Sequence, residues 1–176
     1  MFFAAAYSQS LKPEEISKIK DAVVYVKVKQ KPMILDEEMT VSGTGFFVSK
    51  NGNVITNYHV IQNLVSGYDI FFPTQIEEIK IIRKSGSAEY KTYKATIYAV
   101  DKEHDLAILT LKDSVTVPYL NIDATVKLIE TMPVWVFGYP FGESFAVLQR
   151  GPELAITNGN ITSLRHDDRD KLDRIQ

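Results

Sequence analysis

The chain has 176 residues, of which 45% are hydrophobic and 24% are charged, and its net charge is −2. This composition is typical of a globular protein with a buried core, and it excludes an extended basic face for nucleic acid. There is no cysteine, which excludes a disulfide framework, a thiolate metal site and a cysteine nucleophile. No apolar run approaches the ~18 residues of a membrane span.

The first residues are apolar and then small and polar. Ala4, Ala5 and Ala6 resemble the cleavage region of a signal peptide, although no basic start precedes them. The segment is therefore either the tail of such a signal or a frayed terminus. After it, Ser10 is a candidate N-cap for a short helix with Pro13 in its first turn.

A strand, a hairpin and a short helix follow. Residues 21–30 alternate and are β-branched, which predicts a strand. Residues 43–48 and 53–56 predict a hairpin, because Asn51-Gly52 between them is favoured in type I′ turns. Asn57 or Thr56 then caps a short helix that carries His59.

The rest of the chain shows short apolar stretches between polar loops. We expect residues 116–130 to be a connection, and residues 165–174 to be a charged loop leading into an element that starts at Ile175. Further strands are predicted at residues 68–73, 77–83, 93–101, 105–112, 132–142, 145–151 and 153–164. Many short strands with turn signals and almost no helix indicate an all-β antiparallel barrel or sandwich.

Two titratable residues stand out. A lone histidine such as His59 is commonly satisfied by neighbouring backbone, so a chemical role requires a partner. Asp105 opens the apolar stretch Leu106–Leu111, which we expect to be a strand buried on both faces. A carboxylate at the start of this strand would be partly desolvated and would need a hydrogen-bond donor such as an imidazole N–H. Such a pair leaves the other ring nitrogen as a general base.

The segments around these residues resemble the trypsin-like serine proteases, most closely the HtrA/Deg-type bacterial branch. The similar segments are "GTGFFVSKNGNVITNYHVI", "DKEHDLAIL" and "VWVFGYPFG". The resemblance covers about residues 15–176. It implies two antiparallel Greek-key β-barrels, the second incomplete, and it gives His59 and Asp105 the roles of catalytic histidine and aspartate. The implied division is a terminal segment (1–14), a first barrel (15–120) and part of a second (121–176).

The chain departs from the family pattern at the nucleophile, because no Gly-Asn-Ser-Gly-Gly or Gly-Asp-Ser-Gly-Gly turn is present. Serines at 42, 49, 85, 87, 144 and 163 lack that setting. We therefore expect the serine downstream of Gln176 and the 176-residue chain to be inactive alone. Half a barrel would also leave an apolar face with Trp135, Phe137 and Ile156 uncovered, which indicates a piece of a longer enzyme.

The resemblance implies polypeptide substrates and no cofactor. It also implies a bacterial protein that is exported to a periplasmic or extracytoplasmic location. Whether the protein forms a homo-oligomer stays open. His104 and the acidic surroundings of His166 are expected to be solvated loops, since no metal-ligand spacing is present. Two alternatives remain: a catalytically inactive trypsin-like domain that binds protein, and an unrelated small β-barrel binding domain.

Overall fold

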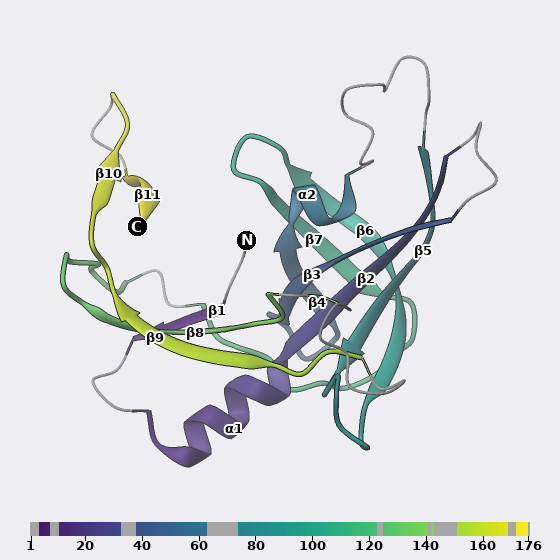
Figure 1. Ribbon diagram of the computed structural model, residues 1–176, viewed down its shortest axis with the longest axis horizontal. Coiled ribbons are helices and arrows are strands. Elements are labelled where there is room, and N and C mark those ends of the chain that lie inside the picture. Colours follow the sequence, from purple (N-terminus) through teal and green to yellow (C-terminus); the bar gives the residue numbers. More distant parts are fainter. Residues whose placement is uncertain are drawn as a thin grey trace.

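A computed structural model describes residues 4–7, 11–32, 38–62, 74–122, 125–140, 142, 151–168 and 172–175 (Figure 1). Within these ranges the chain consists mainly of β-strands, with two helices. The predicted all-β class is confirmed. No helix in the described ranges is long and apolar enough to cross a membrane.

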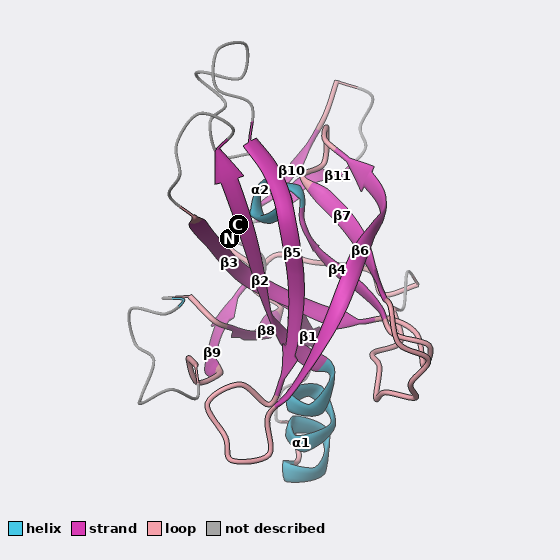
Figure 2. Cartoon of the chain, turned by 90° about the vertical axis from the view of Figure 1, so that its right-hand side faces the viewer, coloured by secondary structure: helices cyan, strands magenta, loops and turns pink. Residues whose placement is uncertain are grey.

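Six antiparallel strands form a closed barrel, whose outer side with β5 and β6 faces the viewer in Figure 2. Their order around the ring is β2 (Val23–Pro32), β3 (Met39–Phe47), β4 (Asn53–Asn57), β7 (Leu106–Leu111), β6 (Lys91–Asp101) and β5 (Thr74–Arg83). β4 pairs with β7 and not with β5, the next strand in the chain. The hairpin of β5 and β6 closes the ring onto β2.

The remaining strands form a smaller, open structure. β8 (Pro133–Gly138) lies between β1 (Ala4–Tyr7) and β9 (Ala155–Asn160) in a three-stranded antiparallel sheet. β10 (Leu164–His166) pairs with β11 (Leu172–Ile175). Over the described residues the second barrel is therefore incomplete, as expected, and the terminal segment supplies a strand that patterning did not predict.

Two predictions near the C-terminal end are wrong. Residues 153–164 do not form one strand, because β9 ends at Asn160 and buried Ile161 turns away to bond with the backbone of Thr131 and Met132. The charged stretch that follows is not simply a loop: β11 runs back along β10, so that Ile175 pairs with Leu164 instead of opening a new element. The strand predicted at 68–73 lies outside the described residues, as do residues 145–150 of the strand predicted at 145–151.

The hairpin between β3 and β4 exists, but its turn is not type I′. Gly52 has a positive φ of 88°, whereas Asn51 does not. The Gly52 N–H donates to the Ser49 carbonyl oxygen, and Val48 pairs with Asn53, so the loop has four residues, Ser49 to Gly52. Loops of this length are usually built around a type I turn, whose two central residues have negative φ, and the left-handed residue here is Gly52, which follows them.

The barrel interior is filled by alternate residues of its strands. Val24, Val26 and Val28 of β2 point inward and pack with residues such as Leu109 of β7, all of them buried. The opposite face of β2, with Val23 and Tyr25, belongs to a second cluster. The first part of β2, Val23–Val26, is therefore apolar on both faces and joins two cores.

The second cluster lies between the barrel, β8 and helix α1 (Pro13–Ala22), which extends below the barrel in both views. Phe137 and Tyr139 are buried there, and Ile16 and Ile19 of α1 pack against it. Of the residues expected to be uncovered, Phe137 is thus fully buried and Trp135 half-buried, while Ile156 is exposed.

Helix α1 was predicted, but its N-cap residue is Lys12, and Ser10 lies outside the described residues. The Lys12 N–H donates to the Glu15 carboxylate at 2.8 Å, which satisfies one of the free donors of the first turn. At the other end, Arg83 of β5 donates to the Asp21 carbonyl oxygen at 3.0 Å. The helix is thereby tied to the barrel.

The strand β7 is buried on one face only. Ala107, Leu109 and Leu111 are buried, whereas Leu106, Ile108 and Thr110 are half-buried. The prediction of two buried faces is wrong, because a continuous apolar run does not by itself distinguish a central strand from the wall of a barrel.

We expect Leu109→Ala to lower the free energy of unfolding by about 2–5 kcal/mol, because the side chain is fully buried in the barrel. Ile108→Ala, on the half-buried face of the same strand, is the matched control and should cost clearly less. Urea unfolding of both variants measures the difference. Equal losses would contradict the assignment of faces.

Candidate active site

His59 lies on a four-residue helix, α2 (Tyr58–Ile61), that follows β4 directly at one end of the barrel. So short a helix has little stability of its own, so packing must hold it in place. Val60 and Ile61 are buried in the barrel core, at 3% and 2% exposure. The Gln62 N–H donates to the Tyr58 carbonyl oxygen at 2.8 Å. His59 is therefore fixed by anchors on its C-terminal side.

Gly43 of β3 makes room for this helix. A Cβ atom at position 43 would lie 2.5 Å from Cγ2 of Val60, closer than side chains tolerate. The first glycine of the Gly43-x-Gly45 motif thus allows α2 to sit close against the barrel. Gly43 thus has a steric role at this position.

Asp105 is placed by the turn between β6 and β7. Its backbone is left-handed, with φ of 55°, a conformation that aspartate tolerates better than most residues. Its carbonyl oxygen accepts the Tyr58 N–H at 3.0 Å. The Lys102 ammonium lies 5.5 Å from the centre of the Tyr58 ring, so the turn and α2 contact each other at two points.

These elements bring His59 and Asp105 together. The ring Nδ1 of His59 lies 2.6 Å from Oδ2 of Asp105, and the His59 backbone N–H donates to Oδ1 at 2.8 Å. Because an ionised carboxylate only accepts, we assign the proton to Nδ1. The assignment leaves Nε2 with a free lone pair that can take up a proton.

The pKa of the Asp105 carboxyl lies below its ordinary value. Partial burial raises the pKa, but hydrogen bonds from the His59 backbone and ring, together with the charge of the protonated ring, outweigh burial and lower it. Both side chains are 43% exposed, so solvent screens the interaction. The ionised carboxylate stabilises the fold at pH values above its unfolded-state pKa, and this contribution is lost as the pH falls through the folded-state pKa.

Asn57 is a member of this site that the sequence analysis considered only as a helix cap. It is the N-cap residue of α2, yet its side chain makes no cap bond. Instead Nδ2 donates to the carbonyl oxygen and to Oδ2 of Asp105, both at 3.0 Å. Only the register of β4 with β7, which pairs Asn57 with Leu106, would have indicated this contact.

The other two histidines are placed differently. His104 lies in the turn before β7, as expected, where its Nδ1 is 2.7 Å from Oδ2 of Asp101. Both partners are largely exposed. His166 ends β10 instead of lying in a loop. No group of three or more metal-ligating side chains occurs in the described part of the chain.

None of the described serines hydrogen-bonds to His59. The Ser49 hydroxyl accepts the Asn53 N–H, and the Ser87 hydroxyl accepts the Glu89 N–H. Ser163 lies between β9 and β10, not in a strand as predicted. Ser144 lies outside the described residues.

The segment that follows β8 is anchored to β3 through Tyr139. The Tyr139 N–H donates to Oγ1 of Thr44 at 2.8 Å, in buried surroundings. Thr56 of β4 donates to the Thr44 carbonyl oxygen at 2.9 Å. Burial raises the pKa of the Tyr139 phenol, so Tyr139 stays neutral. This segment and the residues before His59 are thus joined through β3.

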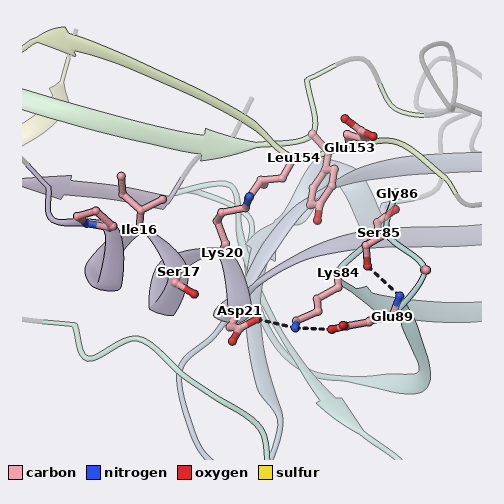
Figure 3. A pocket seen from close by; sticks show the side chains of 14 residues that line it. Ile16, Ser17, Lys20, Asp21, Lys84, Ser85, Gly86, Glu89, Glu153 and Leu154 are labelled. Atoms are coloured by element: carbon pink, nitrogen blue, oxygen red, sulfur yellow. Dashed lines mark hydrogen bonds and ion pairs between the residues drawn. The ribbon is translucent and has the colours of Figure 1, made fainter.

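A cavity of about 750 Å³ does not include the His59–Asp105 pair. It lies beside α1 and the Lys84–Glu89 turn (Figure 3). Lys84 bridges Asp21 and Glu89 at its wall, at 3.5 and 2.9 Å. Three of the charged residues that line this cavity, Asp21, Lys84 and Glu89, are thus joined in one ion-pair network.

Residues 43–176 match the sequence model of the trypsin-like peptidase domain. Serine protease HTRA1 of Xenopus tropicalis is 28% identical over 167 residues, which cover 94% of this chain and 33% of the relative. Serine protease HTRA4 of Mus musculus is 27% identical over 161 residues, covering 86% of this chain and 30% of the relative. Uncharacterized protein y4bJ of Sinorhizobium fredii is 35% identical over 123 residues, which cover 70% of this chain and 16% of the relative.

The chain therefore spans about a third or less of the length of these curated relatives. The match over residues 43–176 excludes the alternative that the motifs occur by chance in an unrelated small β-barrel.

We expect Gly43→Ala to destabilise the fold by about 1–3 kcal/mol, because the added methyl group must displace Val60. Val60→Ala creates the missing space, so the double variant should be less destabilised than the sum of the two single changes. Unfolding by urea measures the cycle. Additive losses would show that the two positions do not touch.

We expect His59→Ala to raise the pKa of Asp105, because the ring hydrogen bond and ring charge that lower it are removed. Carboxyl ¹³C NMR over a pH titration measures the shift. His104→Ala is the matched control: it should raise the pKa of Asp101, which His104 lowers through its side-chain bond, and leave that of Asp105 unchanged. If His104→Ala changed the pKa of Asp105 and His59→Ala did not, the pairing of His59 with Asp105 would be refuted.

Proposed function

Because the chain belongs to the trypsin-like peptidase domain family, we propose that it is the part of a serine endopeptidase that supplies the catalytic histidine and aspartate. His59 is the general base and Asp105 is the residue that orients it. The supporting observation is the 2.6 Å contact between His59 Nδ1 and Asp105 Oδ2, which leaves Nε2 as the proton acceptor.

In the proposed reaction a serine in sequence following Gln176 attacks the carbonyl carbon of a peptide bond. Nε2 of His59 takes the proton from the serine hydroxyl as the new C–O bond forms. The same nitrogen then gives this proton to the leaving amine as the C–N bond breaks. A water molecule then attacks the acyl carbon while Nε2 of His59 takes its proton. The ring returns this proton to the serine oxygen as the acyl C–O bond breaks, which releases the second product as a carboxylic acid and restores the serine hydroxyl. Asp105 remains ionised and stabilises the protonated ring throughout.

The exposure of the pair fits this arrangement. Both side chains are 43% exposed, which leaves them accessible to a serine and a substrate. Covering the pair with the remainder of the second barrel would lower the local dielectric and strengthen its electrostatic interaction. The proposed division assigns residues 15–120 to the first barrel, 121–176 to part of the second and 1–14 to a terminal segment.

The proposed substrates are polypeptides, and the proposed chemistry needs no cofactor. The similarity to HTRA1 and HTRA4, which are named as serine proteases, supports this class of reaction. A relative in the bacterium Sinorhizobium fredii supports a bacterial member of the family, for which we propose an extracytoplasmic location.

We expect His59→Ala and Asp105→Asn, made in the full-length protein, each to abolish most peptide hydrolysis. For Asp105→Asn the expected loss in kcat is about 10⁴-fold, a magnitude borrowed from the trypsin-like family itself. Cleavage of a denatured protein substrate, followed by mass spectrometry, measures it.

The control is His104→Ala, which removes an exposed ring with a similar local contact to Asp101 and should leave the rate unchanged. Cleavage that persists in His59→Ala at the wild-type rate would sink the catalytic assignment. It would favour a trypsin-like domain that only binds protein.

A further inference from the structure

We propose that Asn57 is a positioning residue, whose carboxamide holds both the backbone and the carboxylate of Asp105 in place for His59. This inference rests on the proposed function for its catalytic consequence, but its structural content concerns the Asn57–Asp105–His59 arrangement alone. Asn57 is 7% exposed, and its Nδ2 lies 3.0 Å from two oxygens of Asp105, the carbonyl oxygen and Oδ2.

The first argument is what the Asn57 side chain does not do. An asparagine at an N-cap usually turns its Oδ1 toward the free N–H groups of the helix. Here the side chain makes no cap bond, and Oδ1 is buried without a hydrogen-bond partner in the described structure. Asn57 therefore leaves its acceptor Oδ1 without a hydrogen bond and uses its donor Nδ2 to bind Asp105.

The orientation of the amide follows from its partners. Both atoms that face Nδ2 are oxygens that only accept, so a flipped amide would bring three oxygens together with no proton between them. The donor must therefore face Asp105. The orientation of the carboxamide is thus assigned from its hydrogen-bond partners, because its shape alone does not distinguish nitrogen from oxygen.

The second argument is the backbone of Asp105. Left-handed backbone is unfavourable for a residue other than glycine, and it persists only where the surrounding structure holds it. The Asp105 carbonyl oxygen accepts two hydrogen bonds, from the Tyr58 N–H and from Asn57 Nδ2. Nδ2 of Asn57 thus binds both the backbone carbonyl oxygen and the carboxylate of Asp105.

The third argument is how the carboxylate oxygens are shared. Oδ1 is held by the His59 backbone N–H, and Oδ2 is held by both Asn57 Nδ2 and His59 Nδ1. Two fixed donors, Asn57 Nδ2 and the His59 N–H, therefore set the plane of the carboxylate before the ring binds to it. Without Asn57, the donors that remain among these residues both belong to His59, so Oδ2 would be held only by the ring that the carboxylate has to orient.

The test compares Asn57→Ala with Asn53→Ala, a matched control at the other end of the same strand. Asn53 also bonds across to β7, where its Oδ1 accepts the Thr110 hydroxyl at 3.1 Å. NMR of the 176-residue chain reports the low-field proton on His59 Nδ1 and the ring ¹⁵N shifts that reveal the tautomer. We expect Asn57→Ala to lose or broaden that proton and to mix the tautomers, and Asn53→Ala to retain both signals.

In the full-length protein we expect Asn57→Ala to lower kcat by up to about 10²-fold with KM little changed, since a misplacement of about 1 Å at a catalytic group has that effect. In the Asp105→Asn background the same change should add little, because the group that Asn57 holds has lost its charge. An unchanged His59 signal in Asn57→Ala, or an equal loss in Asn53→Ala, would overturn the inference.

The outcomes separate this inference from the proposed function. If His59→Ala still cleaves, the proposed function is wrong, whereas the NMR comparison still decides whether Asn57 positions Asp105. Should Asn57→Ala fail to fold, Asn57→Ser decides by the same readouts. Serine keeps a polar atom at the buried position, but its hydroxyl is one bond shorter than the carboxamide and we expect it to lose the hold on Oδ2.

Discussion

The antiparallel pairing of β4 with β7 is the constraint on which the site depends. The two strands are separated in the chain by β5 and β6, and their register places Asn57 opposite Leu106. The residues just after β4 and just before β7 therefore meet at one end of the barrel. His59 and Asp105, 46 positions apart in sequence, come within 2.6 Å only because this register is kept. A slip of one residue would turn the side chains of β4 to the opposite face and separate the pair.

The site also illustrates how a fold holds a strained residue. The left-handed backbone of Asp105 is unfavourable, and its carboxylate is partly removed from water. Hydrogen bonds to a charged group contribute about 1.5–3 kcal/mol each when they are shielded, and less at the partial exposure found here. The bonds from Asn57, Tyr58 and His59 converge on this one residue. Strain and desolvation at Asp105 are thus offset by neighbours that the barrel has already fixed.

Most of the barrel could be predicted from the sequence, because its strands carry a periodicity of two and lie between turn residues. β2, β6 and β7 were predicted to within about two residues of each end, which is the usual uncertainty for element boundaries. The pair of His59 with Asp105 was also predicted, through the motifs around it. The turn at Asn51-Gly52 was misassigned in type, because the preference of a dipeptide does not fix the length of the loop.

What could not be predicted depends on contacts between distant segments. β1 is a strand because it pairs with β8, and β11 because it pairs with β10; neither has a strong pattern of its own. The role of Asn57 was hidden for the same reason. An asparagine before a helix is a normal cap, and only its position opposite β7 shows that its side chain has another partner.

Two histidine–aspartate contacts in this chain have nearly equal lengths, 2.6 Å for His59–Asp105 and 2.7 Å for His104–Asp101. Distance therefore does not distinguish a site from a surface contact. His104 and Asp101 are three residues apart in one exposed turn, so a local segment can form their contact without the barrel. The His59 contact requires the β4–β7 pairing, the space at Gly43 and the buried anchors Val60 and Ile61. The orientation of His59 therefore depends on the folded state, through contacts between segments that are far apart in the chain.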